Sequence, residues 1–523
     1  MGHYIKLFQA TVRPGQRNGG DGKKWGTLFL LLSFYLMIAP GCKKILNEPV
    51  LGSYQADNFF TSDANANLAV NAAYTALTFT DAASNAIWVL GDVASDDAIK
   101  GGLPGDQADF ENVDEFNINP SNAAVEAVWQ RYYGGIFKCN VVLDGLPAAN
   151  KKISDNVRTA CIGQAKFLRA YYYFILTNCY GDIPLRLKVE TPEELQSPAI
   201  PRAKVFLQIE NDCKDAAGDL PVTWSGADLG RATKGAALAL LSKVYLFQQK
   251  WDSAAKAAQA VEGLGIYGLL PKFSDNFNAA TKDNKEAIFS VWHVSGASPG
   301  QGNGLNQWFA PRSLNGYGFF YPTQSLVDNF EKSPSGVEDP RLDYTVARAG
   351  HPYYDAAFEP DWTTTGYLSK KDIQPLSEIP SNIKGDGSLN YEAIRFADIL
   401  LVEAEALNEA GNSAAALIPL NKVRKRARDS YLYDSSLPGY GTVPAGLLPD
   451  ITTTDQTQLR AIIRRERRSE MALEFHRFFD VIRYGKDYAD NAMGSVPNFS
   501  YDKDKFFPIP QSERDTNQKL GIK

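Results

Sequence analysis

Apolar residues recur at every third or fourth position along much of the chain, the period of one face of a helix. Two such segments, 125–146 and 157–180, predict a pair of consecutive helices. A second pattern is a weak internal repeat: the stretch 240–255 lines up with the stretch 400–415, 160 positions later. In both copies a leucine pair is followed by a short turn and an alanine-rich segment, which predicts a helix, a turn and a second helix.

Small residues where two helices approach closely make this unit resemble a tetratricopeptide repeat. The alternative is a chance match between two alanine-rich helices. On the repeat interpretation the chain is mainly α, a tetratricopeptide-like helical repeat scaffold with long loops and a few short strands. Stacked helix pairs of this kind bury one another and leave their loops free for binding.

Between residues 263 and 390 the helical period gives way to loops rich in Gly, Asn, Pro and aromatic residues. Only Ala287–Trp292, sequence AIFSVW, reads as a short strand. Loops of this length are usually functional.

Near the C-terminus, the segment 459–485 places two carboxylates on an apolar helix face. Leu459, Ile462 and Ile463 begin the face, and Glu466 and Glu470 continue it. We expect both glutamates to be buried, because a carboxylate on such a face is tolerated only when it is paired. The arginines within one turn are the expected partners, with a solvated charged face as the alternative. These arginines are Arg464, Arg467, Arg468 and Arg477.

This segment, with its RRERRSEMALE core, resembles the C-terminal signature of the SusD/RagB family. Four other stretches resemble family blocks in the same order: LGDVASDDA at 90–98, 163–185, 390–411 and FPIP at 507–510. The resemblance implies an outer-membrane lipoprotein without enzymatic activity, which captures nutrients, mostly glycans. It also implies a partner, a SusC-like TonB-dependent transporter, and one domain over 42–523 with an N-terminal part of about 43–230 and a C-terminal part of about 280–523.

The first 41 residues are typical of a lipoprotein signal peptide. Basic residues precede an apolar run, Thr27–Ala39, which is shorter than the ~20 residues that span a bilayer. Gly41-Cys42 follows, so we expect cleavage to leave Cys42 as a lipidated first residue, with an uncleaved anchor as the alternative. Lys43-Lys44 replace the acidic residues that often follow this cysteine in the family, so exposure on the cell exterior is implied by the resemblance alone.

Composition excludes several classes of function. The formal net charge is −6 with no basic stripe, which argues against nucleic-acid binding. The other cysteines form no CxxC pair, so zinc is not expected, and buried free thiols are favoured over disulfides. These cysteines are Cys139, Cys161, Cys179 and Cys213.

Catalytic and cofactor motifs are missing from the sequence, and we expect no metal, no cofactor and no enzyme activity. The four histidines, His3, His293, His351 and His476, are scattered, and no GxSxG or Walker pattern occurs. The GxGxxG at 263–268 follows an alanine-rich helix, so it predicts a helix end rather than a dinucleotide site. Adjacent Asp96 and Asp97 are expected to order a turn and to point apart.

Aromatic residues carry the candidate ligand site. Trp308, Tyr317 and Trp362 lie in the long loops and are the predicted platforms for sugar rings. A flat aromatic packs on the apolar face of a sugar while polar side chains bind its hydroxyls; the polar candidates are Arg312 and Asn315, and Tyr353 is a further aromatic one. The alternative for each aromatic is an anchor that ties a loop to the scaffold, which is the role expected of Phe319 and Phe320.

The leading functional hypothesis is capture of oligosaccharides at the outer membrane. The second is transporter-associated capture of peptides or other non-glycan nutrients, and glycan binding would separate the two. An enzyme is the third, because a catalytic carboxylate pair can come from anywhere in a chain.

Overall fold

Helices form most of the structure, a computed structural model that describes residues 59–296, 300–379 and 385–521. The mainly α prediction is confirmed. All described elements belong to one unit, Ala56–Lys523. The predicted signal peptide 1–41 and Cys42 lie outside the described residues.

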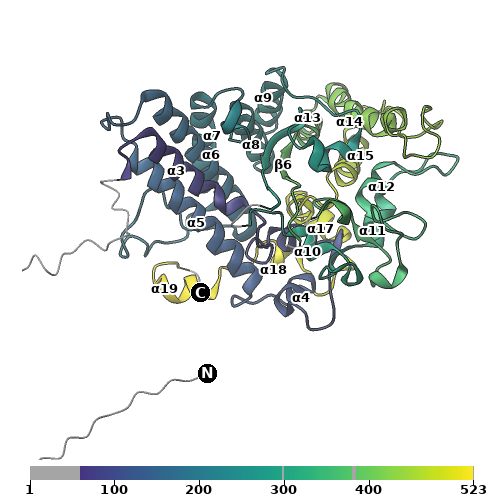
Figure 1. The fold of residues 1–523 in the computed structure, drawn as a ribbon, viewed down its shortest axis with the longest axis horizontal. Coiled ribbons are helices and arrows are strands. Elements are labelled where there is room, and N and C mark those ends of the chain that lie inside the picture. The colour runs from purple at the N-terminus through teal and green to yellow at the C-terminus, as the bar shows by residue number, and fades with distance from the viewer. Residues whose placement is uncertain (1–58, 297–299, 380–384, 522–523) are drawn as a thin grey trace, which may run out of the picture. The chain divides into compact units, whose positions relative to one another are not determined.

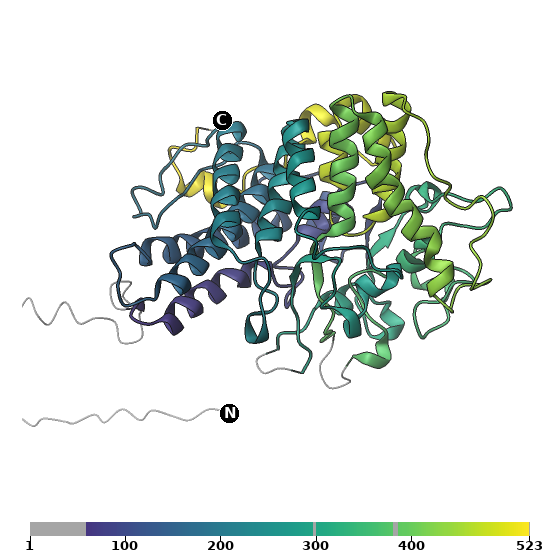
Figure 2. The same ribbon diagram turned by 90° about the horizontal axis from the view of Figure 1, so that it is seen from above.

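The long helices pack side by side, each on the next one along the chain (Figure 1). The repeated segments form two helix pairs, α8–α9 and α13–α14, and the pairs pack on each other through α9 and α13, as the repeat interpretation predicts (Figure 2). In spatial order the helices are α3 (Asp63–Tyr74), α5 (Ala123–Gly145), α6 (Asp155–Tyr180), α7 (Arg202–Asp219), α8 (Lys234–Phe247), α9 (Trp251–Glu262), α13 (Phe396–Glu409) and α14 (Ser413–Tyr433).

Local sequence signals set the helix ends. The Asn122 side-chain oxygen accepts the backbone N–H groups of Ala124 and Val125 at 3.0 and 3.2 Å and so starts α5. Helix α9 ends at Glu262, and the glycine-rich stretch 263–268 follows with Gly265 at φ +68°. The interpretation of this stretch as a helix end is therefore confirmed.

The strands form three antiparallel pairs and no larger sheet within the described residues. The predicted strand is β2 (Ala287–Val291), which ends one residue earlier than expected and pairs with β6 (Tyr391–Arg395). The other pairs are β1 (Ala98–Gly101) with β3 (Phe319–Pro322), and β4 (Val346–Ala347) with β5 (Leu368–Ser369). The remaining helices are α4 (Ala108–Asp114), α10 (Leu305–Phe309), α11 (Gln324–Asn329), α12 (Arg341–Thr345), α15 (Gln456–Glu470), α16 (Arg477–Arg483), α17 (Lys486–Ala492), α18 (Tyr501–Asp504) and α19 (Gln511–Thr516).

Both glutamates of α15 are buried and bound to arginines, as predicted. The partners differ from the expected ones, because they come from other elements. Glu470 accepts hydrogen bonds from Arg341 at 3.0 Å and Arg395 at 3.1 Å, and also from Arg426. Glu466 pairs at 2.6 Å with Arg341 and with Arg424.

The four arginines predicted as partners serve other sites. Arg464, Arg467 and Arg468 lie one or two positions from Glu466, on other faces of α15, and Arg477 belongs to α16. Arg467 binds Asp398 and Asp480, Arg464 lies over the ring of Tyr484, and Arg468 and Arg477 bind the adjacent Asp96 and Asp97.

The resemblance segment 90–98 packs against the start of α16. The Asp92 carboxylate accepts the backbone N–H groups of Phe475 and Arg477 at 2.8 and 2.9 Å. Asp96 and Asp97 lie in a turn, as predicted, but the expectation that they point apart is wrong. A turn has neither strand alternation nor helical rotation, so both carboxylates reach the same two arginines.

All four cysteines in the described chain are buried and free, which confirms the preferred interpretation. Burial raises the pKa of the Cys161 thiol to about 11, so this thiol is protonated and unreactive at neutral pH.

We predict that Glu470→Ala destabilises the fold by roughly 3–5 kcal/mol, because it leaves Arg395 and Arg426 buried without their shared partner. Chemical denaturation of wild type and variant measures the change. The matched control is Glu193→Ala, which removes an exposed glutamate and is expected to change the free energy of unfolding by less than about 0.5 kcal/mol. Equal stability of Glu470→Ala and wild type would contradict the burial.

The same carboxylate predicts a pH dependence. Burial alone would raise the pKa of Glu470, but Arg426, Arg395 and Arg341 hold it at about 2, below its usual 4.5. A lowered folded-state pKa contributes stability that is complete above pH 4.5 and is lost as the pH falls toward 2, roughly 3 kcal/mol in total. The difference in unfolding free energy between wild type and Glu470→Gln should therefore shrink as the pH is lowered from 5 toward 3, and a constant difference would rule this out.

Candidate functional site

Four of the predicted ligand residues gather on α10 and on the short segment that leads from it to β3. Tyr317 is 37% exposed, and its ring meets that of Trp308 edge-on at 5.5 Å. Arg312 and Asn315 are exposed beside them, and Arg312 is paired with Asp106. Trp308 itself is half-buried among the rings of Trp88, Phe110 and Phe319.

The remaining two residues, Tyr353 and Trp362, lie together on another loop with ring centroids 6.2 Å apart. Tyr353 is only 2% exposed and offers no ring face to a ligand, which corrects its assignment as a ligand contact. Trp362 is half-buried, and its carbonyl accepts the Tyr321 hydroxyl at 3.0 Å. The expected anchors Phe319 and Phe320 are buried, as predicted.

The structure exposes a further candidate platform for a ligand ring, which the sequence analysis did not include. Trp292 follows β2 directly and is 38% exposed. It lies between two adjoining hollows of about 170 and 270 Å³, which share Leu229, Gly230, Arg231 and Ser290 with it. We call these two hollows and the residues they share the Trp292 groove.

Aromatic and polar side chains line the rest of the Trp292 groove. Trp224 and Tyr267 lie in the smaller hollow and are fixed by hydrogen bonds, the Trp224 indole N–H donating to the Ala232 carbonyl at 2.8 Å and the Tyr267 hydroxyl lying 3.1 Å from Thr233 Oγ1. Asn71 and Tyr74 from the end of α3, and Thr78 shortly after it, line the larger one. The charge of Arg231 is matched by Asp228 at 2.7 Å. Lys282 and Asp283 also line the smaller hollow, and Lys282 donates to the His293 and Ser388 carbonyls at 3.1 and 3.0 Å.

Neighbouring contacts hold Trp292 in place. Its backbone continues the β2–β6 ribbon, and the next residue, His293, turns inward and is buried. His293 Nε2 accepts the backbone N–H of Phe79 at 3.0 Å, so the ring proton resides on Nδ1, which lies 3.1 Å from the Val291 carbonyl. Burial and the charge of Lys282 lower the pKa of His293 to about 4, which keeps this contact neutral at physiological pH.

Gly230 makes room for the indole. A Cβ atom at this position would lie 2.9 Å from the Trp292 ring, and its φ of +86° is one that glycine alone adopts readily. The alternation of side chains along a strand could have revealed Trp292 from the sequence. It is the last residue of the one predicted strand, and because its neighbours Val291 and His293 are buried, its own side chain points outward.

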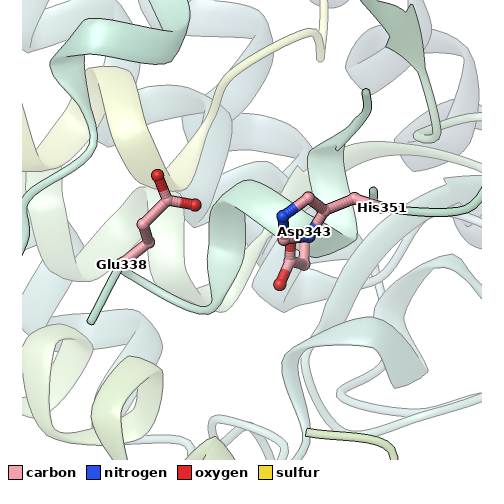
Figure 3. Close-up of side chains that lie close together, drawn as sticks. All are labelled: Glu338, Asp343 and His351. Atoms are coloured by element: carbon pink, nitrogen blue, oxygen red, sulfur yellow. The ribbon is translucent and has the colours of Figure 1, made fainter. Parts of the chain in front are cut away.

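A cluster of Glu338, Asp343 and His351 brings three possible metal ligands within 4.8 Å of one another. Figure 3 shows Asp343 and His351 side by side, with Glu338 farther off. Arg348 donates to both carboxylates, at 2.7 Å to Asp343, and Lys332 reaches Glu338 at 3.0 Å. Because these cations already match the negative charge, the arrangement is an ion-pair cluster and does not point to a metal.

No helix in the described part of the chain is both long and apolar enough to cross a membrane.

Comparison with known proteins identifies relatives along nearly the whole chain. Residues 285–521 match the family model described as SusD family, and residues 31–246 match one described as starch-binding associating with outer membrane. SusD-like protein P2 of Formosa agariphila is 27% identical over 95% of this chain and 98% of its own length.

Solved structures share the fold. A SusD superfamily protein from Bacteroides vulgatus superposes with a TM-score of 0.75 at 24% identity, covering 88% of this chain and 98% of that one. A laminarin-binding SusD-like protein gives a TM-score of 0.71 at 28% identity, with the same coverage of 88% and 98%. With two family models that together match most of its length, a full-length SusD-like relative and this shared fold, the chain belongs to the SusD/RagB family.

Proposed function

We propose that this protein is an outer-membrane lipoprotein that binds oligosaccharides and delivers them to a SusC-like TonB-dependent transporter. The observation that carries the proposal is the Trp292 groove, an exposed indole between two hollows with aromatic and amide side chains. A solved relative described as laminarin-binding supports a carbohydrate as the ligand.

The chemistry of the groove suits a sugar chain. An indole face packs on the apolar C–H face of a pyranose ring, while amide and hydroxyl groups bind the hydroxyls around its edge. Asn71 and Thr78 supply such groups in the larger hollow, and Thr233 supplies one in the smaller. Arg231 is paired with Asp228, and Lys282 and Asp283 in the smaller hollow carry opposite charges, so the charges of the groove balance and favour a neutral ligand.

The cluster of Trp308, Tyr317, Arg312 and Asn315 is proposed as a second contact surface. Its exposed part consists of Tyr317, Arg312 and Asn315, whereas Trp308 gives much of its surface to core contacts. Trp362 is proposed for a weaker role, since it is half-buried beside the buried Tyr353.

We predict that Trp292→Ala weakens binding of laminarin oligosaccharides on the order of 30-fold, since truncating a central aromatic contact costs ~2 kcal/mol. Calorimetry measures the affinity and circular dichroism confirms the fold. Trp308→Ala, Tyr317→Ala and Trp362→Ala are the comparison variants.

If Trp292→Ala binds like wild type while Tyr317→Ala does not, the site lies on the α10–β3 segment instead. Wild-type protein that binds no member of a glycan array but binds peptides would favour the alternative, transporter-associated capture of peptides or other non-glycan nutrients. Sugar release from a bound glycan would reveal an enzyme.

We further propose that the mature protein is residues 42–523, a single domain with Cys42 as its lipidated first residue. Several acyl chains hold a protein stably on a bilayer, so Cys42→Ala is expected to move the protein from the membrane fraction to the soluble fraction and to abolish labelling by a radioactive or alkyne fatty acid. Membrane association and labelling unchanged in Cys42→Ala would contradict the anchor.

A further inference from the structure

A separate hollow of about 190 Å³ opens where α6 ends and α7 begins. Cations and aromatic rings line it, chiefly Arg202, Lys505, Phe247, Phe479, Tyr501 and Phe506. It shares no lining residue with the Trp292 groove, and within the described chain no carboxylate lines it.

Arg202 is held rigidly but its charge is not matched. Its Nε donates to the Thr177 carbonyl at 3.2 Å, and Nη2 donates to Asn178 Oδ1. These acceptors fix the guanidinium plane, and its centre lies 4.6 Å from the Phe206 ring and 5.6 Å from the Phe506 ring. Asp182 accepts the Arg202 backbone N–H at 2.8 Å and acts on the guanidinium from farther away, but the guanidinium forms no salt bridge within the described chain. The burial of this unmatched charge lowers the pKa of Arg202 to about 10.

Lys505 is the second unmatched cation of the hollow. Its ammonium lies 5.8 Å from the centre of the Tyr501 ring and has no ion pair among the described residues. Arg483 also lines the hollow, but Glu405 and Asp480 already bind it at 2.8 and 2.7 Å. The net charge facing the hollow is therefore positive, from Arg202 and Lys505.

An unmatched cation in a partly dry hollow is costly unless an anion completes it. A guanidinium with a free N–H edge is suited to an oxyanion. The aromatic walls also fit a ligand with an apolar face, which a bare inorganic ion lacks.

We propose that this hollow binds the carboxylate group of a uronic acid residue, with Arg202 and Lys505 on the oxyanion and the rings of Phe247, Phe479 and Phe506 around the sugar. The site is distinct from the neutral-sugar groove at Trp292 and does not depend on the function proposed for that groove.

Calorimetric titration of the protein with sodium glucuronate at low ionic strength tests the proposal. We expect saturable binding that weakens as salt is added, no binding of glucose in this hollow, and weaker binding of sodium sulfate. Arg202→Gln and Lys505→Gln should each reduce the affinity for glucuronate about tenfold or more, because each removes a charge-assisted contact.

Lys204→Gln is the matched control, because Lys204 is exposed on the same helix outside the hollow and its loss changes the net charge equally. It should bind glucuronate like wild type, and so should Trp292→Ala, which separates this site from the groove. If Arg202→Gln fails to fold, Lys505→Gln alone decides.

Three results would overturn the proposal. One is no saturable glucuronate binding by the wild type. Another is wild-type affinity in Lys505→Gln. That result would place the anion elsewhere, and the role of Arg202 would then be limited to its hydrogen bonds at the end of α6. The third is sulfate or phosphate binding as tightly as glucuronate, which would remove the sugar from the assignment.

Discussion

The buried ion-pair network around α15 is the constraint on which the C-terminal half of the structure depends. Glu470 alone joins α12, β6 and α14 through Arg341, Arg395 and Arg426. Burying several charges costs much desolvation energy, so such a network adds little net stability over a well-packed apolar core. Its geometric demand is strict, because each carboxylate must meet its guanidinium or remain as an unpaired buried charge. The network therefore specifies one arrangement of these elements.

The network also reaches the candidate ligand surface. Arg395, the last residue of β6, binds Glu286 at 2.8 Å, and Glu286 immediately precedes β2. The β2–β6 ribbon is thus fixed at the end opposite Trp292, which follows β2. A ligand platform gains affinity from being held in its bound orientation before the ligand arrives. Here the pre-organisation comes from a charge network inside the protein, and the inward turn of His293 fixes the other end of the ribbon.

Sequence periodicity was sufficient to predict the helical repeats, the strand 287–292 and the burial of Glu466 and Glu470, because each follows from one local pattern. The partners of the glutamates could not be predicted in this way. Arg341 and Glu470 are 129 positions apart, and local spacing favours the nearer Arg467 and Arg468. Loop aromatics were similarly ambiguous: composition alone does not distinguish Tyr353, which is buried, from Trp292, which is exposed beside Gly230.

The groups that contact ligands in both proposed sites differ from the groups that hold the fold. Trp292 is uncharged and 38% exposed, and Lys505 makes no ion pair in the described chain, whereas Glu470 and Arg395 are fully buried. Substitution of an exposed platform removes contact area without leaving a buried charge unpaired, so its effect on stability is small. The same scaffold can therefore accept other groove residues, and with them other ligands, while the α15 network remains unchanged. Arg202 is the exception, because it both fastens the end of α6 and faces the basic hollow, so its replacement couples ligand affinity to stability.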